Sequence, residues 1–275
     1  MISKTEPYSP ALPMADTVPS PEAMIRVDSY PSELVREWVG ERGARRRYKV
    51  ARAVGFQDLG DVLGCGRWGC VYQVPGPWVV KVTADPTEAP MWARLASMRR
   101  RTPHLLEGAA RTANIVRLRP ELHYGPDETY EVFAVVREEA HPFLDGDTAS
   151  VATHARITER DVKLISGALL GYRRAAQVFH EGERRQWAID EMRDSADVLE
   201  SVAGADLLAT TLRYLAVSAV APQDVHLNNI GWRKHERLPD QSDAPLGLIV
   251  TDPGHTPTVW QTEDEIPIEE YAVNR

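Results

Sequence analysis

Residues Gly64–Tyr72 read GCGRWGCVY, and a turn at Pro75–Pro77 separates them from Trp78–Val82, which read WVVKV. The preceding residues Asp58–Leu63 (DLGDVL) are also strand-like. Together these stretches predict three short strands, joined first by a glycine-rich turn and then by a proline-glycine turn. The first half of the chain is therefore expected to be β-rich.

The same stretch carries groups suited to binding phosphate. Gly64, Gly66 and Gly69 let the backbone approach a phosphate closely, and a lysine on the third strand, Lys81, can reach it as a point charge. The G-x-G-x-x-G spacing also occurs in dinucleotide-binding folds, where a helix follows the last glycine. Here the β-rich segment Val71–Val74 follows, so we favour a phosphate-binding hairpin.

A helix is predicted to start within Asp85–Leu95, directly after the strand that carries the lysine. Glu88 in this helix has two interpretations. It pairs with Lys81 and orients it, or it caps the helix together with Asp85, which stands at capping-box spacing. We favour the pairing with Lys81, for which Glu107 is a more distant substitute.

The rest of the chain predicts the end of a small β-rich lobe and then a helical lobe. Asn114–Leu118, Leu122–Tyr124 and Tyr130–Val136 are strand-like, and Arg137–Pro142 is expected to be an extended connector. The helical lobe is predicted from apolar residues at helical spacing, which we interpret as core. These residues are Val162, Ile165, Leu169, Tyr172, Ala176, Phe179, Trp187, Met192, Leu199, Val202, Leu208, Leu212, Leu215 and Ala219.

Two polar motifs lie near the end of the chain. The first is Asp224–Asn229 (DVHLNN), and the second is Asp252–Gly254 (DPG). A carboxylate in the first motif can accept a hydroxyl proton, while an amide oxygen and a second carboxylate can hold Mg²⁺. Short strands predicted at Ile230–Trp232 and Leu246–Val250 place the two motifs at the same end of a hairpin, where both can face one metal ion.

Taken in order, these motifs resemble those of the protein-kinase-like superfamily, which includes the aminoglycoside and choline phosphotransferases. The resemblance spans residues 58–254. The matching positions are the glycine-rich loop, the third-strand lysine, the catalytic loop and the metal-binding motif. They are Gly64, Gly66, Gly69, Val71, Lys81, Asp224, Asn229, Asp252 and Gly254.

The resemblance implies an α+β, bilobal protein-kinase-like fold that binds ATP and Mg²⁺ between its lobes. The β-rich N-lobe is expected at residues 32–139 and the helical C-lobe at 140–275, after a mobile proline-rich tail at 1–31. It implies catalytic roles for Asp224, Lys81 and Glu88, with Asn229 and Asp252 as metal ligands. The nucleotide would be bound by Gly64, Gly66, Gly69, Val71 and Lys81, and the connector near Glu138 would contact adenine.

Several positions depart from the pattern of a regulated protein kinase. Pro222-Gln223 stands where His-Arg usually precedes the catalytic aspartate, and Pro253 stands where phenylalanine is usual. His226 gives the D-x-H pattern of small-molecule phosphotransferases. Only 21 residues follow Gly254, so we expect a C-lobe truncated after the D-P-G motif. The D-x-H-x-x-N pattern with a T-D-P ending also resembles compact kinase-like proteins of bacteria and their phages.

The expected function is transfer of the γ-phosphate of ATP to a hydroxyl acceptor, which is either a protein Ser/Thr or a small molecule. The alternative is a nucleotide-binding pseudokinase or scaffold. A net charge of −8 argues against a nucleic-acid partner, and no apolar run approaches the ~20 residues of a membrane span. Because the N-terminus has no hydrophobic signal core, a cytoplasmic location is expected.

Cys65 and Cys70 are the two cysteines of the chain, and they flank the tip Gly66–Gly69 of the predicted hairpin. They could lie opposite each other and form a disulfide that locks the phosphate-binding loop, which we call the redox lock. The alternative, which we favour from sequence, is two small residues at positions where bulk would clash. Without companion histidines, a zinc site is not expected.

Overall fold

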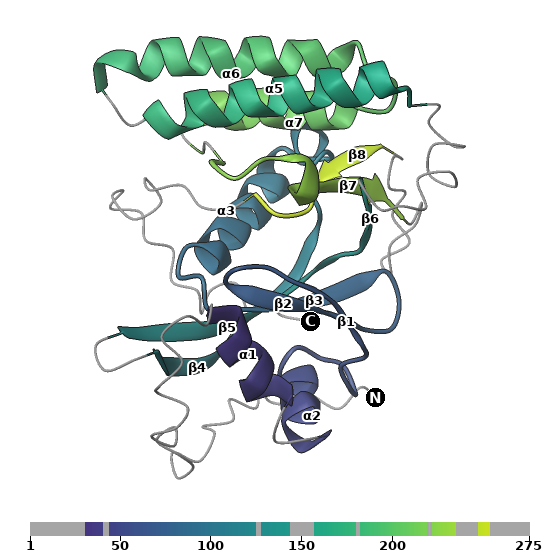
Figure 1. The fold of residues 1–275 in the computed structure, drawn as a ribbon, viewed down its shortest axis with the longest axis vertical. Coiled ribbons are helices and arrows are strands. Elements are labelled where there is room, and N and C mark those ends of the chain that lie inside the picture. The colour runs from purple at the N-terminus through teal and green to yellow at the C-terminus, as the bar shows by residue number, and fades with distance from the viewer. Residues whose placement is uncertain are drawn as a thin grey trace.

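The computed structural model describes residues 31–40, 44–124, 128–143, 157–179, 182–218, 220, 222–234 and 247–253. These residues form an α+β structure with a β-rich N-terminal part and a helical part after it (Figure 1). The expected tail lies outside the described residues except for Pro31, and so do residues 254–275.

A five-stranded antiparallel sheet forms the N-terminal part, as predicted. Its spatial order is β1-β2-β3-β5-β4. The first three strands are β1 (Val62–Cys65), β2 (Gly69–Gln73) and β3 (Trp78–Thr83). The strand-like stretches at 114–118 and 122–124 lie in one long strand, β4 (Thr112–Tyr124), which pairs with β5 (Glu128–Glu138) through several register shifts.

Helices cover both faces of this sheet. On one face lie α1 (Pro31–Gly40) and α2 (Ala44–Ala53), with valines of α1 and α2 packed on side chains of β2, β3 and β5. Helix α1 begins at Pro31, and proline is well suited to the first position of a helix. The opposite face, which carries Lys81, packs against α3 (Glu88–Arg101).

Three helices form a layer at the far end of the molecule from α1 and α2 (Figure 1). They are α5 (Glu159–Val178), α6 (Arg185–Glu200) and α7 (Asp206–Val217). The predicted apolar stripes are largely buried between them. Trp187 is an exception, because it is 52% exposed, so its assignment to the core is wrong; Ala219 lies outside the described residues.

A three-stranded sheet, in the order β6-β7-β8, lies between the helical layer and the larger sheet (Figure 1). Its strands are β6 (Ala140–Pro142), β7 (Ile230–Arg233) and β8 (Leu248–Val250). The predicted pairing of β7 with β8 is therefore confirmed. The described single-turn 3₁₀ helices are η2 (Pro103–Leu105), η3 (Gly182–Arg184) and η4 (Leu227–Asn229).

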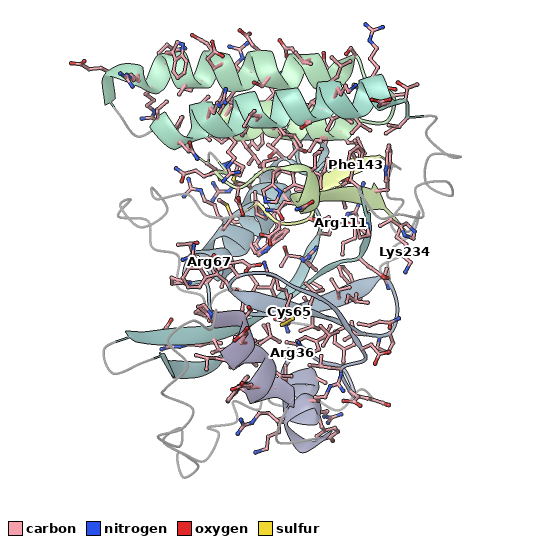
Figure 2. The ribbon with its side chains drawn as sticks, viewed as in Figure 1. Arg36, Cys65, Arg67, Arg111, Phe143 and Lys234 are labelled. Atoms are coloured by element: carbon pink, nitrogen blue, oxygen red, sulfur yellow. A yellow bond between two sulfur atoms is a disulfide. The ribbon has the colours of Figure 1, made fainter. Side chains whose placement is uncertain are left out.

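A buried ion pair connects the two parts of the molecule where β5 ends. Arg233 of β7 donates from Nε to Oε1 of Glu138 over 2.7 Å, and both side chains are fully buried. Arg233 Nη2 also donates to the Glu107 carbonyl (2.7 Å), and the Arg111 backbone N–H donates to Glu138 Oε2 (3.1 Å). Arg111 lies between the larger sheet and the helical layer (Figure 2).

Arg233→Met should lower the free energy of unfolding by about 3–5 kcal/mol, because it leaves the buried carboxylate of Glu138 without its counter-charge. Urea denaturation measures this. The matched control is Arg117→Met, which removes a half-exposed partner of Glu131 and should cost about 1 kcal/mol or less. Equal losses in the two variants would contradict a structural role for the Arg233–Glu138 pair.

Candidate active site

Lys81 lies between two carboxylates that come from distant parts of the chain. Its Nζ is 2.8 Å from Glu88 Oε1 on α3, and it also donates to Oδ2 of Asp252, just beyond β8. The side chain of Glu88 is 2% exposed, and its Oε1 also accepts from Trp92 Nε1 (3.3 Å). Glu88 is therefore fixed by two donors, and Lys81 is held against Asp252.

The charges at this position stabilise one another. Burial by itself would lower the pKa of the Lys81 ammonium, but the Asp252 and Glu88 carboxylates outweigh it and hold that pKa above its usual range. Lys81 is therefore a cation at physiological pH. A cation held within strand β3 is suited to contacting the phosphates of a nucleotide.

The two sequence interpretations of Glu88 can now be distinguished. The N-cap of α3 is Thr87, whose N–H and hydroxyl both donate to Asp85 Oδ1, at 2.8 and 2.6 Å. The carboxylate of Glu88 contacts Lys81 instead of capping the helix, so the predicted pairing is present. Glu107 pairs with Arg111 and Arg233, which excludes it as the lysine partner in this structure.

The stretch predicted as a catalytic loop is a compact turn around Asp224. Asn229 donates from Nδ2 to the Asp224 carbonyl (2.7 Å) and to Asp224 Oδ2 (3.2 Å). His226 accepts the Asn228 N–H at Nδ1 (3.2 Å), and its Nε2 lies 3.5 Å from Asp224 Oδ1. The carboxylate of Asp224 is 41% exposed, so an acceptor hydroxyl can reach it.

Asn229 also connects this loop to Asp252. Its carbonyl accepts the backbone N–H groups of Thr251 (2.8 Å) and Asp252 (3.3 Å). Its side-chain amide donates through nitrogen, and no residue of the described chain donates to the amide oxygen. One amide oxygen and one nearby carboxylate are the kind of oxygen donors that Mg²⁺ uses alongside phosphate and water.

Within the described ranges, no group of three or more His, Cys, Asp or Glu side chains could hold a metal ion. This agrees with the chemistry of the donor set. A Mg²⁺ ion shared with a nucleotide needs few protein carboxylates, because phosphate oxygens and water complete its coordination. Asn229 and Asp252 are the residues that would hold such an ion. Gly254 of the D-P-G motif lies outside the described residues.

Arg173 is a site residue that the sequence patterns do not predict. It lies on α5, and its Nη2 is 3.8 Å from Asp224 Oδ1. The contact joins residues far apart in the chain, and on a helix the arginine looks like any solvated charge. Only the packing of α5 against η4 brings it to the site. A guanidinium beside Asp224 adds positive charge where a phosphoryl group would be transferred.

The three glycines of the β1–β2 hairpin differ in what surrounds them. A Cβ at Gly69 would lie 2.2 Å from the Val82 carbonyl oxygen, so the backbone of β3 requires a glycine there. A Cβ at Gly64 or Gly66 would meet no atom within 4 Å. These two glycines leave open space on the hairpin, which is the space that a phosphate group would need. Val71 pairs with Lys81 across β2 and β3.

Cys65 and Cys70 form a disulfide across the hairpin, where they are paired residues of β1 and β2. Cys65 is labelled beside the hairpin in Figure 2. The sequence-based preference for two small, unbonded residues is therefore wrong. The start of α1 holds the same loop, since the Ser32 N–H donates to the Arg67 carbonyl (3.1 Å) and Cys70 Sγ lies 3.8 Å from the Ser32 carbonyl oxygen.

The carboxylate of Glu138 is committed to the Arg233 ion pair, and its backbone N–H donates to the Arg111 carbonyl (2.8 Å). The next N–H, of Glu139, donates to the Pro77 carbonyl (2.8 Å). Neither of these donors nor the carboxylate is available to a base in this structure. A base contact near the connector stays a prediction and would involve other groups there.

Comparison of the sequence with models of known protein families found no match, and comparison with curated proteins found none either. The helices of the described residues include none that is both long enough and apolar enough to cross a membrane. A functional assignment therefore depends on the geometry around Lys81, Asp224 and Asp252.

Gly69→Ala should lower the free energy of unfolding by about 1–3 kcal/mol, because its methyl group would overlap the backbone of β3. Gly66→Ala is the matched control on the same loop and should change stability by less than about 0.5 kcal/mol. Thermal denaturation compares the two. Similar losses of stability in the two variants would contradict the distinction between a packed Gly69 and an open Gly66.

The redox lock predicts that a dithiol reductant changes the phosphate-binding loop. Reduction transfers two electrons and two protons to Cys65 and Cys70 and oxidises the dithiol to its own disulfide. Amide hydrogen exchange at residues 66–69 should become faster, and nucleotide affinity should fall. In a reducing compartment the bond would be transient, so the same change would act as a switch.

The control for this prediction is Cys65→Ala, in which the reductant should have no further effect. Its exchange rates should match those of the reduced wild type with or without the dithiol. Identical nucleotide affinity in the oxidised and reduced wild-type protein would dismiss the lock.

Proposed function

We propose that this protein is an ATP- and Mg²⁺-dependent phosphotransferase with a protein-kinase-like bilobal fold. The reaction moves the γ-phosphate to a hydroxyl group, on a protein Ser/Thr or on a small molecule. The observation that carries the proposal is Lys81, held by Glu88 on one side and by Asp252 on the other. This contact joins the glycine hairpin to the segment that carries Asp224 and Asn229.

The strand order supports the fold part of the proposal. One chain combines three features. They are the sheet order β1-β2-β3-β5-β4, a helix that supplies the partner of the β3 lysine, and a polar loop before the β7–β8 hairpin. No single one of these features is specific to a kinase-like fold. Their combination supports it, because a lysine suited to phosphate, a carboxylate suited to accept a proton and two oxygen donors then belong to one site.

Each residue of the site has a separate role in the proposed reaction. Lys81 binds and orients the triphosphate, and the open backbone at Gly64 and Gly66 leaves room for it. When bound, Mg²⁺ would neutralise charge on the phosphates, with Asn229 and Asp252 holding it. Asp224 accepts the proton of the acceptor hydroxyl while the hydroxyl oxygen forms the new bond to the γ-phosphorus. The bond from that phosphorus to the bridging oxygen breaks, and ADP leaves.

The environment of Asp224 is suited to the role of base. Asn229 donates to Oδ2 and fixes the carboxylate, and Oδ1 points to the side of Arg173 and His226. These groups offer positive charge or a hydrogen-bond donor to a phosphoryl group in transfer.

Asp224→Asn should lower the rate of label transfer from γ-labelled ATP by about 10²- to 10⁴-fold, because the amide cannot accept the hydroxyl proton. Host-lysate proteins and a metabolite pool are offered as acceptors in separate assays, which identifies the acceptor class. Asp252→Ala should also abolish transfer. The control is Asp197→Asn on α6, an exposed partner of Arg213 that lies in no proposed site.

Two outcomes would overturn the proposal. If Mg²⁺ and ATP raise the melting temperature, yet wild type and Asp224→Asn transfer equal label, the protein is a nucleotide-binding scaffold of the pseudokinase kind. If no nucleotide raises the melting temperature, both functions are excluded.

A further inference from the structure

Arg137 is a buried arginine on the same face of the sheet as Lys81. The β3–β5 register pairs Lys81 with Val135 and Val79 with Arg137. Because alternate residues of a strand point to the same face, Val79, Lys81, Val135 and Arg137 share one face. Arg137 directly precedes Glu138, the last residue of β5, where the chain continues into the connector.

The side chain of Arg137 has no hydrogen-bond or ion-pair partner among the described residues, although the residue is only 8% exposed. Its Nε is buried and unpaired. Glu88 and Asp252 are close enough to act on its charge, but both are bound to Lys81. An arginine does not lose its proton in a protein, so Arg137 stays a buried cation whose N–H donors lack acceptors.

Two other arginines with little exposure donate to several acceptors. Arg233 donates to the Glu138 carboxylate and the Glu107 carbonyl. Arg99 donates to the carbonyls of Leu106, Ala109 and Ala110. The Nε of Arg99 is also unpaired, but Arg137 is the more deeply buried of the two and has no acceptor on any of its nitrogens among the described residues. Unpaired buried donors of this kind cost folding free energy, so the absence of acceptors at Arg137 points to a ligand that supplies them.

We propose that Arg137 binds the base of the nucleotide and makes the site prefer guanine over adenine. Guanine carries an oxygen at its six-position. This inference rests on the proposed function and changes only the base of the phosphate donor. A triphosphate bound at Lys81 and the hairpin places its base further along β3 and β5, toward the connector. That is where Val79 and Arg137 lie.

The preference follows from the donor and acceptor groups. A guanidinium has five N–H donors and no acceptor. Guanine offers two neighbouring acceptors, O6 and N7, which a guanidinium can bind with two parallel hydrogen bonds. Adenine carries an amino group at the six-position, so it would place a donor against a donor. The low exposure of Arg137 strengthens this discrimination, because an unmet donor costs more free energy where access to water is restricted.

The test measures dissociation constants of GTP, ATP and ITP by calorimetry in Mg²⁺. GTP should bind about tenfold or more tightly than ATP. ITP has the six-position oxygen without the two-amino group, so it should bind like GTP. In Arg137→Met, a side chain of similar length without donors, the preference for GTP over ATP should disappear. Arg117→Met on the neighbouring strand is the control and should keep it.

The outcomes separate this inference from the proposed function. If the wild type binds ATP as tightly as GTP, or if Arg137→Met keeps the wild-type ratio, the base-reading role is wrong while phosphate transfer can stand. If no nucleotide binds to the folded wild type, the proposed function fails and the inference with it. Circular dichroism confirms that each variant is folded.

Discussion

A buried ammonium group needs counter-charge, and this requirement at Lys81 determines the arrangement of the site. The residues paired with Lys81 in the sheet, Val71 and Val135, are apolar, so the carboxylates come from elsewhere. Glu88 arrives on α3, and Asp252 arrives from a point 171 residues further along the chain. The β-rich part and the loop after β8 must therefore meet at Lys81, and Asn229 and Asp224 are carried there by hydrogen bonds to that loop.

A second buried ion pair fixes the two parts at another point. Arg233 and Glu138 are fully buried where β5 gives way to the connector, and Arg233 also binds the Glu107 carbonyl. One contact alone would leave the parts free to rotate about it. Two separate contacts, at Lys81 and at Glu138, define the distance and the angle between the glycine hairpin and the Asp224 loop. Under the proposed function, the spacing for phosphate transfer would depend on these two ion pairs.

The sequence was sufficient for features whose causes are local. Strand and turn patterns predicted β1 to β3, and the spacing between Lys81 and Glu88 predicted their pairing. Features that depend on tertiary contacts were not predictable. The approach of Arg173 to Asp224 depends on how α5 packs, and the pairing of Glu138 with Arg233 depends on the register of β6 and β7. The disulfide was misjudged because a hairpin register decides whether two cysteines face each other. Arg137 was expected in the connector, but β5 continues through it to Glu138, so that expectation is wrong.

The hairpin shows how one element can serve stability and chemistry on opposite faces. On the face covered by α1, the Cys65–Cys70 disulfide and the start of α1 hold the loop. Gly69 lets β2 pack closely on β3. On the face of Lys81, Gly64 and Gly66 leave space that no side chain fills. Packing alone does not account for glycine at those two positions. Under the proposed function, a nucleotide phosphate that approaches the backbone there would account for it, with the cation of Lys81 on the same side.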